Sequence, residues 1–440
     1  MPRRIALALA PLLLAVAASA ALAQPNAAKL VPESRHLIRA GRMVDTRAGR
    51  VLEDRGILVE GERIAAVGPY AEVLAKAGKV DRTIDLSNAT VLPGLIDAHT
   101  HVLLQGDITQ AEYDDQILKE STPYRTIRAT VAARIAVNNG FTAIRDLETE
   151  GAMYADVDVK RAIANKIIPG PRMFCATRAF SATGMYPVLG YSWELKMPEG
   201  VQVVDGPDAI RKAVREQVKF GADWIKFYSD RKYFIKDGAL HSKVNFTPEE
   251  LQAMVGEAHR LDRRVAAHAM GKEGIAAALD AGADTIEHGD GLDSELMDRM
   301  IAKGVYWCPT IYVGVWVADG RGKLWQDMRD LEAKAFALAV KKGVKIAYGT
   351  DAGGYPWTEN QAKEFAYMVQ YGMTPMQAIQ SATTVAAELL QAEADLGAIE
   401  VGKYADIVAV ARDPLADITE LQRVKFVMKN GEMIRDDLPR

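Results

Sequence analysis

Cysteine is scarce in this sequence of 440 residues, which contains only Cys175 and Cys308. Scaffolds held together by several disulfides are therefore excluded. Each cysteine sits in an apolar run typical of a buried strand, so we expect two buried free thiols. Pairing, which an exported chain would permit, is the alternative. With 49% hydrophobic residues, the chain is able to build a large core without such cross-links.

An excess of positive charge is also lacking. Lysine and arginine total 54 against 58 aspartates and glutamates, which gives a net charge of −4, and the sequence has no basic stripe. Nucleic-acid binding depends on basic groups that neutralise phosphates, so we do not expect nucleic acid as a partner.

Only one long hydrophobic stretch is present, and it lies at the N-terminus. Arg3 and Arg4 precede an apolar run over 5–18, and the small residues that a signal peptidase reads end at Ala23. We predict a signal peptide over 1–23 and a periplasmic or secreted mature protein. The sequence leaves the export route open. The run is shorter than the roughly 20 apolar residues of a membrane-spanning helix, so we expect no membrane span after cleavage.

The sequence pattern of the chain changes twice. Strand-like segments with turns dominate 24–92 and 397–440, whereas short apolar runs alternate with helical stretches over 93–396. The eight runs are 94–98, 142–145, 172–176, 224–227, 264–267, 285–287, 305–309 and 345–349. Such alternation predicts an α/β fold, a (β/α)8 TIM barrel, with both ends of the chain joined in a small β-sandwich. A doubly wound open sheet is the rival, but no GxGxxG or P-loop motif follows a run.

Histidine is sparse too, yet four of the seven histidines follow predicted barrel strands. His99 and His101 are two residues apart, so both point to the same side of an extended chain. His268, His288 and Asp351 end three later strands. Because the carboxyl ends of barrel strands meet at the barrel mouth, we expect these five side chains to converge on a metal site.

Lys226 lies inside the fourth predicted barrel strand, where an ammonium group is costly to bury. One interpretation is that its side chain reaches solvent or pairs with an acid. The other is that carbon dioxide carbamylates Lys226, which turns a cation into an anion able to bridge two metal ions.

The chemistry-bearing motifs occur in a fixed order: Pro93-Gly94-Leu95-Ile96-Asp97-Ala98-His99-Thr100-His101, Lys226, His268, Glu287-His288-Gly289 and Gly349-Thr350-Asp351-Ala352-Gly353. On these motifs the sequence resembles the amidohydrolase superfamily, binuclear metal subtype, across the mature chain. Within it, the sequence is similar to imidazolonepropionase-related and Xaa-Pro dipeptidase-like amidohydrolases, the bacterial ochratoxin-degrading ones above all.

This resemblance implies two divalent metal ions, zinc by default, with manganese or cobalt as substitutes. The implied ligands are His99, His101 and Asp351 for one ion, and His268 and His288 for the other. Carbamylated Lys226 and a hydroxide would bridge the ions, and Asp351 would pass the hydroxide proton to the leaving nitrogen. The resemblance also implies a homo-oligomer, such as the octamers that relatives form.

Four further residues are candidates for substrate binding. Tyr228 lies two residues beyond Lys226, and in dipeptidase-like relatives a tyrosine here contacts the α-carboxylate of the substrate; packing at the barrel rim is the alternative. Arg178 follows the third strand, where a cation suits a carboxylate. Met185 and Tyr186 stand where many relatives carry Gly-His, which favours an apolar wall.

We therefore expect hydrolysis of an amide bond that releases an apolar or aromatic amino acid from N-acyl amino acids or dipeptides, ochratoxin A included. A cyclic-imide hydrolase or lactonase on the same scaffold is the alternative. Deaminases of this superfamily usually lack the bridging lysine, so Lys226 disfavours them. A non-enzymatic protein on this scaffold is a further alternative. Such proteins usually lose metal ligands, whereas all six candidate metal-site residues are present in this sequence.

Overall fold

The computed structural model describes residues 34–186 and 191–438. The predicted signal peptide, 1–23, and the first part of the predicted N-terminal β segment, 24–33, lie outside the described residues. Among the described residues, no helix combines the length and the apolar character that crossing a membrane requires.

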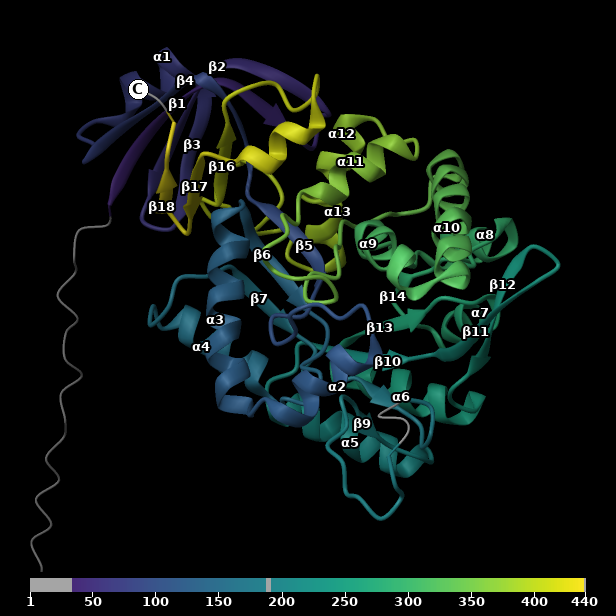
Figure 1. The fold of residues 1–440 in the computed structure, drawn as a ribbon. Helices are drawn as coiled ribbons and strands as arrows, with labels where there is room; N and C mark the ends of the chain where they lie inside the picture. Colours follow the sequence, from purple (N-terminus) through teal and green to yellow (C-terminus); the bar gives the residue numbers. More distant parts are fainter. Residues whose placement is uncertain (1–33, 187–190, 439–440) are drawn as a thin grey trace, which may run out of the picture. The chain divides into compact units, whose positions relative to one another are not determined.

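Strands from both ends of the chain form one sheet of seven strands, coloured purple to blue and yellow in Figure 1. These strands are β1 (Arg35–Asp45), β2 (Arg50–Glu60), β3 (Arg63–Pro69), β4 (Arg82–Pro93), β16 (Ile407–Val410), β17 (Phe426–Lys429) and β18 (Glu432–Asp436). The order is β18-β17-β16-β4-β1-β2-β3, and the antiparallel pair β4–β16 joins the two ends. Ile38, Ile57 and Phe426 lie in its buried core. The two-sheet sandwich itself stays a prediction.

Seven of the eight apolar runs form parallel strands. They are β5 (Leu95–Thr100), β6 (Phe141–Asp146), β7 (Arg172–Cys175), β10 (Trp224–Tyr228), β13 (Arg264–Ala269), β14 (Thr285–His288) and β15 (Tyr306–Cys308). They pair in chain order, as β5-β6-β7 and β10-β13-β14-β15. The strand order of a doubly wound sheet reverses at a switch point. These paired strands show no such reversal, which supports a barrel-type arrangement.

The eighth run, 345–349, lies between the last strand and the first. Trp307 N donates a hydrogen bond to the carbonyl oxygen of Lys345 at 2.8 Å on the β15 side. On the β5 side, Ala98 N donates to the carbonyl oxygen of Tyr348, also at 2.8 Å. These bonds connect β15 to β5 through the eighth run.

The ring is less regular between β7 and β10. Asp223 N donates to the carbonyl oxygen of Cys175 at 2.7 Å, and β10 pairs with the short strand β8 (Phe180–Ser181), which pairs with β9 (Gln202–Val203). A fully closed ring of eight strands therefore stays a prediction.

Helices follow most of these strands (Figure 1). They are α1 (Tyr70–Ala77), α2 (Gln110–Lys119), α3 (Thr122–Asn138), α4 (Ala155–Ala164), α5 (Pro207–Lys219), α6 (Pro248–Arg260), α7 (Lys272–Ala281), α8 (Ser294–Lys303), α9 (Ile311–Arg321), α10 (Lys323–Lys342), α11 (Lys363–Gln370), α12 (Pro375–Ser381), α13 (Thr384–Leu389) and the 3-10 helix η1 (Ile418–Arg423). A hairpin of β11 (Asp230–Lys236) and β12 (Ala239–Val244) follows β10. Local signals set several starts: Thr247 and Glu250 form a capping box at α6, with proline at the first helical position.

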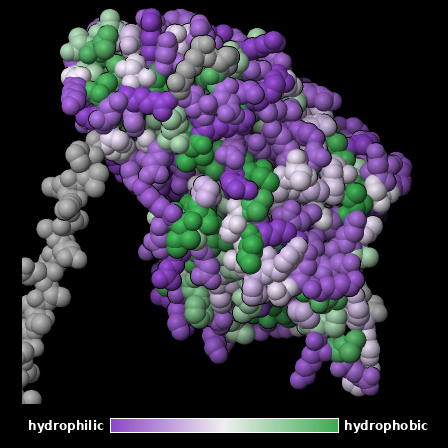
Figure 2. All heavy atoms as spheres, turned by 60° about the vertical axis from the view of Figure 1, so that its left-hand side comes forward, coloured by the Kyte–Doolittle hydropathy of each residue, from purple (hydrophilic) through white to green (hydrophobic). Residues whose placement is uncertain are grey.

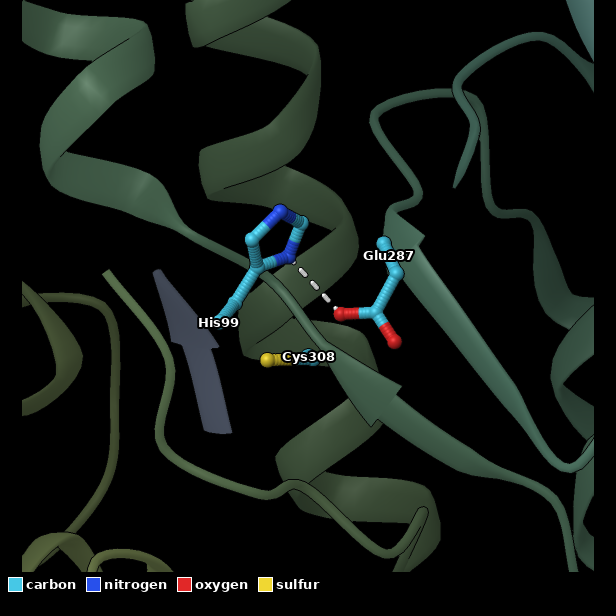
Figure 3. A group of neighbouring side chains, drawn as sticks. All are labelled: His99, Glu287 and Cys308. Carbon is cyan, nitrogen blue, oxygen red and sulfur yellow. Dashed lines mark hydrogen bonds and ion pairs between the residues drawn. The ribbon is translucent and has the colours of Figure 1, made fainter. Parts of the chain in front are cut away.

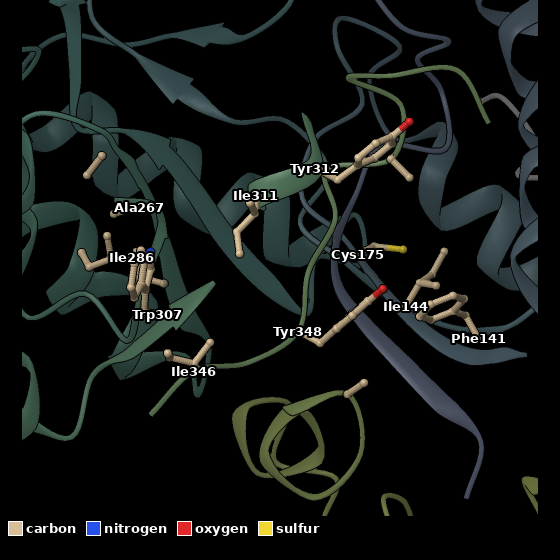
Figure 4. Close-up of a cluster of buried hydrophobic side chains, with 14 of the residues drawn as sticks. Phe141, Ile144, Cys175, Ala267, Ile286, Trp307, Ile311, Tyr312, Ile346 and Tyr348 are labelled. Carbon is tan, nitrogen blue, oxygen red and sulfur yellow. The ribbon is translucent and has the colours of Figure 1, made fainter. Parts of the chain in front are cut away.

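The main core lies between the strands and the helices. Figure 4 shows part of it, with Phe141, Trp307 and Tyr348 among the buried side chains. Cys175 and Cys308 are both free and buried, which confirms the expectation of two unpaired thiols.

The molecular surface is mostly hydrophilic on the face drawn in Figure 2, with apolar side chains gathered near its middle. Helix α3, on the left of Figure 1, exposes Tyr124, Ile127 and Val131. Their spacing places these three residues on one face of the helix.

Candidate active site

A cavity of about 550 Å³ opens at the carboxyl ends of the parallel strands. All six residues that the sequence proposes as metal ligands line it: His99, His101, Lys226, His268, His288 and Asp351. His99, Lys226, His268 and His288 lie in four strands, His101 directly follows β5, and Asp351 lies in the loop after the eighth run. The convergence follows from the parallel strands, whose carboxyl ends share one edge.

Three of these residues lie within reach of one ion. Nε2 of His101 is 3.0 Å, and Nε2 of His99 is 3.6 Å, from Oδ1 of Asp351, and the two Nε2 atoms are 3.3 Å apart. Burial raises the pKa of Asp351, but the hydrogen bond from His101 and the electrostatic effect of the neighbouring histidines outweigh burial, and the pKa lies below its ordinary value. This donor set of two imidazoles and one ionised carboxylate suits a divalent cation.

The other two histidines stand beside this group. The ring centroids of His268 and His288 are 4.5 Å apart, and those of His99 and His288 are 5.0 Å apart. Nε2 of His268 lies 2.7 Å from the hydroxyl of Tyr233, and Nδ1 of His288 lies 2.9 Å from the hydroxyl of Thr310. Each ring therefore has its other nitrogen free to act as a ligand.

A buried hydrogen bond to Glu287, which itself pairs with Arg145, orients the ring of His99. Its Nδ1 donates to Glu287 at 2.8 Å, as Figure 3 shows, and the other oxygen of Glu287 pairs with Arg145, also at 2.8 Å. Burial, and next the charge of Lys226, holds the pKa of His99 well below its ordinary value, so the ring is neutral. Neutral imidazole is the form that binds metals.

Cys308 lies near His99 and Glu287, and the three could in principle surround an ion (Figure 3). However, burial raises the pKa of the Cys308 thiol well above its ordinary value, and Glu287 already accepts bonds from His99 and Arg145. A thiol must lose its proton to bind a metal. This group therefore supports His99 and does not form a second metal site.

Lys226 stays inside the cavity and does not reach solvent. Its side chain is 1% exposed, and none of the ion pairs among the described residues includes it. Burial lowers the pKa of its amine, although Glu287, Glu148 and Asp351 oppose that effect. The first interpretation drawn from the sequence was that Lys226 reaches solvent or pairs with an acid. Its burial excludes an ordinary surface lysine, and no acid in the described part of the chain forms an ion pair with it.

The candidate substrate residues divide into two pairs. Tyr228 and Tyr186 line the cavity, where their hydroxyls donate to Glu148 at 2.5 Å and to Glu150 at 2.7 Å. Arg178 and Met185 are not among the residues that line it. The Arg178 guanidinium reaches the carbonyl oxygen of Val201 at 3.5 Å, and Met185 packs against the main core.

Arg231 is a cavity residue that sequence reasoning missed. Its guanidinium carbon lies 4.2 Å from the ring centroid of Tyr228 and 4.7 Å from that of Tyr186, and its Nε has no hydrogen-bond partner. It is the first cation after the strand that carries Lys226, which is the signal that could have found it. An arginine stacked on two rings presents a flat, oriented fork to an anion.

A family model named the amidohydrolase family matches residues 90–434. The chain belongs to the amidohydrolase family. A model named the bacterial imidazolonepropionase-like composite domain matches residues 56–77. Ochratoxinase of Aspergillus niger is 31% identical over 422 residues, covering 88% of this chain and 84% of the relative. Imidazolonepropionase of Micrococcus luteus is 24% identical over 374 residues, covering 82% of this chain and 88% of the relative.

Solved structures agree with this assignment. A Xaa-Pro dipeptidase with bound methionine in its active site is 35% identical and superposes with a TM-score of 0.80, covering 91% of this chain and all of the other. A prolidase complexed with N-methylphosphonate-L-proline is 26% identical, with a TM-score of 0.80 and coverage of 92% and 100%. The amidohydrolase thus has a TIM-barrel-type α/β fold, and it is a hydrolase that acts on C–N bonds, as the sequence predicted.

Sequence reasoning gave no role to the residues that contact the amidohydrolase's histidines, which are Glu287, Arg145, Tyr233 and Thr310, although Glu287 stands in the Glu287-His288-Gly289 motif. Glu287 immediately precedes His288, so strand alternation points it away from the side of its neighbour. It contacts His99 of β5 only through tertiary packing, which local sequence does not show.

Proposed function

We propose that this amidohydrolase cleaves the amide bond between an acyl or aminoacyl group and an amino acid, and releases the amino acid. The observation that carries the proposal is the position of Arg231, an oriented cation in the same cavity as the histidine cluster. A carboxylate held there would place the neighbouring amide beside the candidate metal ligands. The names of the relatives support an amino-acid product, since one binds methionine and another a proline phosphonate.

The cluster fits the two divalent ions that the family implies. His99, His101 and Asp351 would hold one ion, and His268 and His288 the other. When bound, the ions would acidify a water molecule and polarise the scissile carbonyl group. Zinc suits this set of imidazole and carboxylate donors.

Lys226 would complete the site as a carbamate. Burial lowers the pKa of its amine, which raises the fraction of neutral amine that can react with carbon dioxide. The reaction forms a bond between Nζ and carbon, releases one proton and leaves a carboxylate-like anion. That anion would replace a buried amine that forms no ion pair with a described residue, and it would offer carboxylate-like oxygens to the metal ions.

Asp351 would move the proton. It is ionised, because its pKa lies below the ordinary value, and it contacts both His99 and His101. In that position it would accept the proton of the attacking water and donate it to the leaving nitrogen, so that the amine departs neutral.

Arg231 would bind the carboxylate of the substrate, with Tyr228 at its side. The sequence favours an apolar or aromatic amino acid, such as the phenylalanine of ochratoxin A. Of the two residues behind that expectation, Tyr186 lines the cavity and Met185 does not. The preference for an apolar or aromatic amino acid stays a prediction.

We further propose a closed eight-stranded barrel, a homo-oligomer such as an octamer, and export to the periplasm or beyond with loss of residues 1–23. No specific feature of the site favours a cyclic imide or a lactone over an amide, so these substrates enter only as outcomes of the test.

The test is release of amino acid from a panel of N-acetyl amino acids and dipeptides, with ochratoxin A included and bound metal measured on the same protein. We expect about two ions per chain, amide cleavage, and loss of both in Lys226→Ala. Arg231→Met should raise KM for N-acetyl amino acids by roughly tenfold or more, with less effect on the matching N-acetyl amino acid amides, which lack the carboxylate.

Two outcomes would contradict the proposal. If the protein binds metal but cleaves only lactones or cyclic imides, the proposed metal site stands and the proposed substrate class is wrong. A protein that binds no metal after reconstitution with zinc and bicarbonate would contradict the mechanism itself.

A further inference from the structure

Two buried acidic residues that are not candidate metal ligands line the cavity. Asp290 follows β14, two residues beyond His288, and Glu332 lies on α10. Asp290 is 6% exposed and Glu332 is 2% exposed. Oδ2 of Asp290 and Oε1 of Glu332 have no hydrogen-bond partner, and neither residue forms an ion pair with a described residue.

The chain supplies no cation for these carboxylates within its described part. Arg329 and Arg321 also line the cavity, but Arg329 pairs with Asp330 and Arg321 pairs with Asp107. A buried carboxylate without a partner is costly, and proteins retain such groups mainly where a ligand satisfies them. Gly314 leaves space beside Glu332, because an added Cβ would stand 3.3 Å from its Oε2.

The wall next to these carboxylates is apolar. Met270 and Met328 are 6% and 1% exposed and line the cavity together with Val313 and Val317. Methionine adapts its shape to an alkyl chain. The cavity therefore combines apolar side chains with two buried acids whose pKa burial raises, because burial disfavours the charged form. A cation bound beside them would favour their ionised forms, and this combination suits a flexible alkyl stem with a cationic head.

We propose that Asp290 and Glu332 bind a cationic group of the substrate, an ammonium or a guanidinium. The inference rests on the proposed amide hydrolysis and deepens it, because it names the class of substrate. Arg231 then takes the carboxylate, and the two acids take the cation.

Two parts of a substrate could supply the cation. One is the side chain of a released lysine or arginine, whose stem fits the apolar walls. The other is the N-terminal ammonium of a dipeptide. The walls favour the first source, which differs from the apolar or aromatic product that the sequence suggests.

The test compares three substrates of the holoenzyme. N-acetyl-L-arginine has the cationic side chain, L-alanyl-L-norleucine has only the N-terminal ammonium, and N-acetyl-L-norleucine has neither. We expect kcat/KM for at least one cationic substrate to exceed that for N-acetyl-L-norleucine by about tenfold or more. Glu332→Gln should reduce that ratio by about tenfold. Asp290→Asn should have the same effect, and the metal content of this variant is measured as well because Asp290 lies two residues after His288.

The matched control is Glu295→Gln, which removes one exposed carboxylate on α8 and should leave the ratio unchanged. Selectivity for arginine indicates the side chain as the source, and selectivity for the dipeptide indicates the ammonium. Equal rates for all three substrates, unchanged in Glu332→Gln, would overturn the inference while the proposed amide hydrolysis stands.

A second measurement separates the inference from catalysis. Calorimetry of the holoenzyme with free L-arginine, L-alanyl-L-norleucine and L-norleucine reports binding even if no amide is cleaved. L-norleucine carries only the α-ammonium, whereas L-arginine adds a guanidinium and the dipeptide carries its ammonium one residue farther from the carboxylate. We expect one of these two cationic ligands to bind more tightly than L-norleucine, and Glu332→Gln to remove the difference. L-norleucine binding as tightly as both cationic ligands would overturn the inference independently.

Discussion

At the scale of single residues, two candidate ligands adopt an unusual backbone conformation. His288 has φ 69° and Asp351 has φ 58°, both in the left-handed region that residues with a Cβ rarely adopt. Each stands where its strand or apolar run ends and the chain turns. Strained residues of this kind persist where the surrounding structure holds them, and they gather at functional sites.

The buried hydrogen bond between His99 and Glu287 leads to a prediction about single residues. Glu287→Gln removes the negative charge that holds the Nδ1 proton of His99 and leaves Arg145 without its partner. Support of this kind raises the basicity of a ligating histidine. We expect metal affinity, measured by competition with a chelator, to fall roughly 10–100-fold, and amide cleavage to fall with it.

The matched control is Glu273→Gln, because Glu273 also accepts from a histidine, His241, at 2.6 Å, but outside the cavity. Metal affinity should not change in this variant. If Glu287→Gln bound metal as tightly as the unaltered protein, Glu287 would be a packing residue only.

At the scale of elements, the eighth apolar run packs very closely against its neighbours. A Cβ added at Gly349 would stand 2.1 Å from the Cys308 sulfur on β15 and 2.9 Å from Cβ of His99 on β5. Only glycine therefore allows the run to lie between these two strands.

Gly349→Ala should destabilise the protein by about 1–3 kcal/mol, because overpacking forces neighbouring atoms apart. It should also lower the metal content, because the displaced neighbour is a candidate ligand. Thermal unfolding and metal analysis measure the two effects. Adding Cys308→Ala should recover part of the stability, since it removes the nearer of the two clashes.

Gly256→Ala provides the control with the opposite sign. Gly256 lies inside α6, is exposed, and an added Cβ there would meet no atom within 4 Å. Alanine should stabilise this helix by about 0.5–1 kcal/mol. Equal effects of the two substitutions would show that the contacts of Gly349 do not matter.

At the scale of the whole molecule, the site joins residues spread over most of the chain, from His99 to Asp351. Bound metal would tie β5, β10, β13, β14 and the loop after the eighth run together. A ligand that binds only the folded state stabilises it by mass action. The exposed apolar residues of α3 are a surface that self-association could cover, but oligomerisation stays a proposal.

Removal of metal should therefore destabilise the entire catalytic region. We expect a chelator to abolish amide cleavage and to lower the melting temperature by several degrees, on the order of 5 °C. Zinc added with bicarbonate should restore both, and zinc without bicarbonate should restore less if Lys226 is carbamylated. An unchanged melting temperature after verified metal removal would contradict a metal that links these strands.

The sequence by itself determined the parts of this protein that depend on local pattern. Alternating apolar runs and helices predicted the parallel strands, because strand and helix periods are properties of short segments. The candidate ligands His99, His101, His268 and His288 were visible for the same reason: each ends a strand, and parallel strands end at one edge.

Only the tertiary structure decided which distant side chains support and complete the site. Glu287 meets His99 across 188 positions of sequence. Arg231 enters the cavity and Arg178 does not, although both follow barrel strands. Asp290 and Glu332 face one cavity from different elements. Such pairings depend on how whole elements pack in three dimensions, and no local spacing or composition encodes that packing.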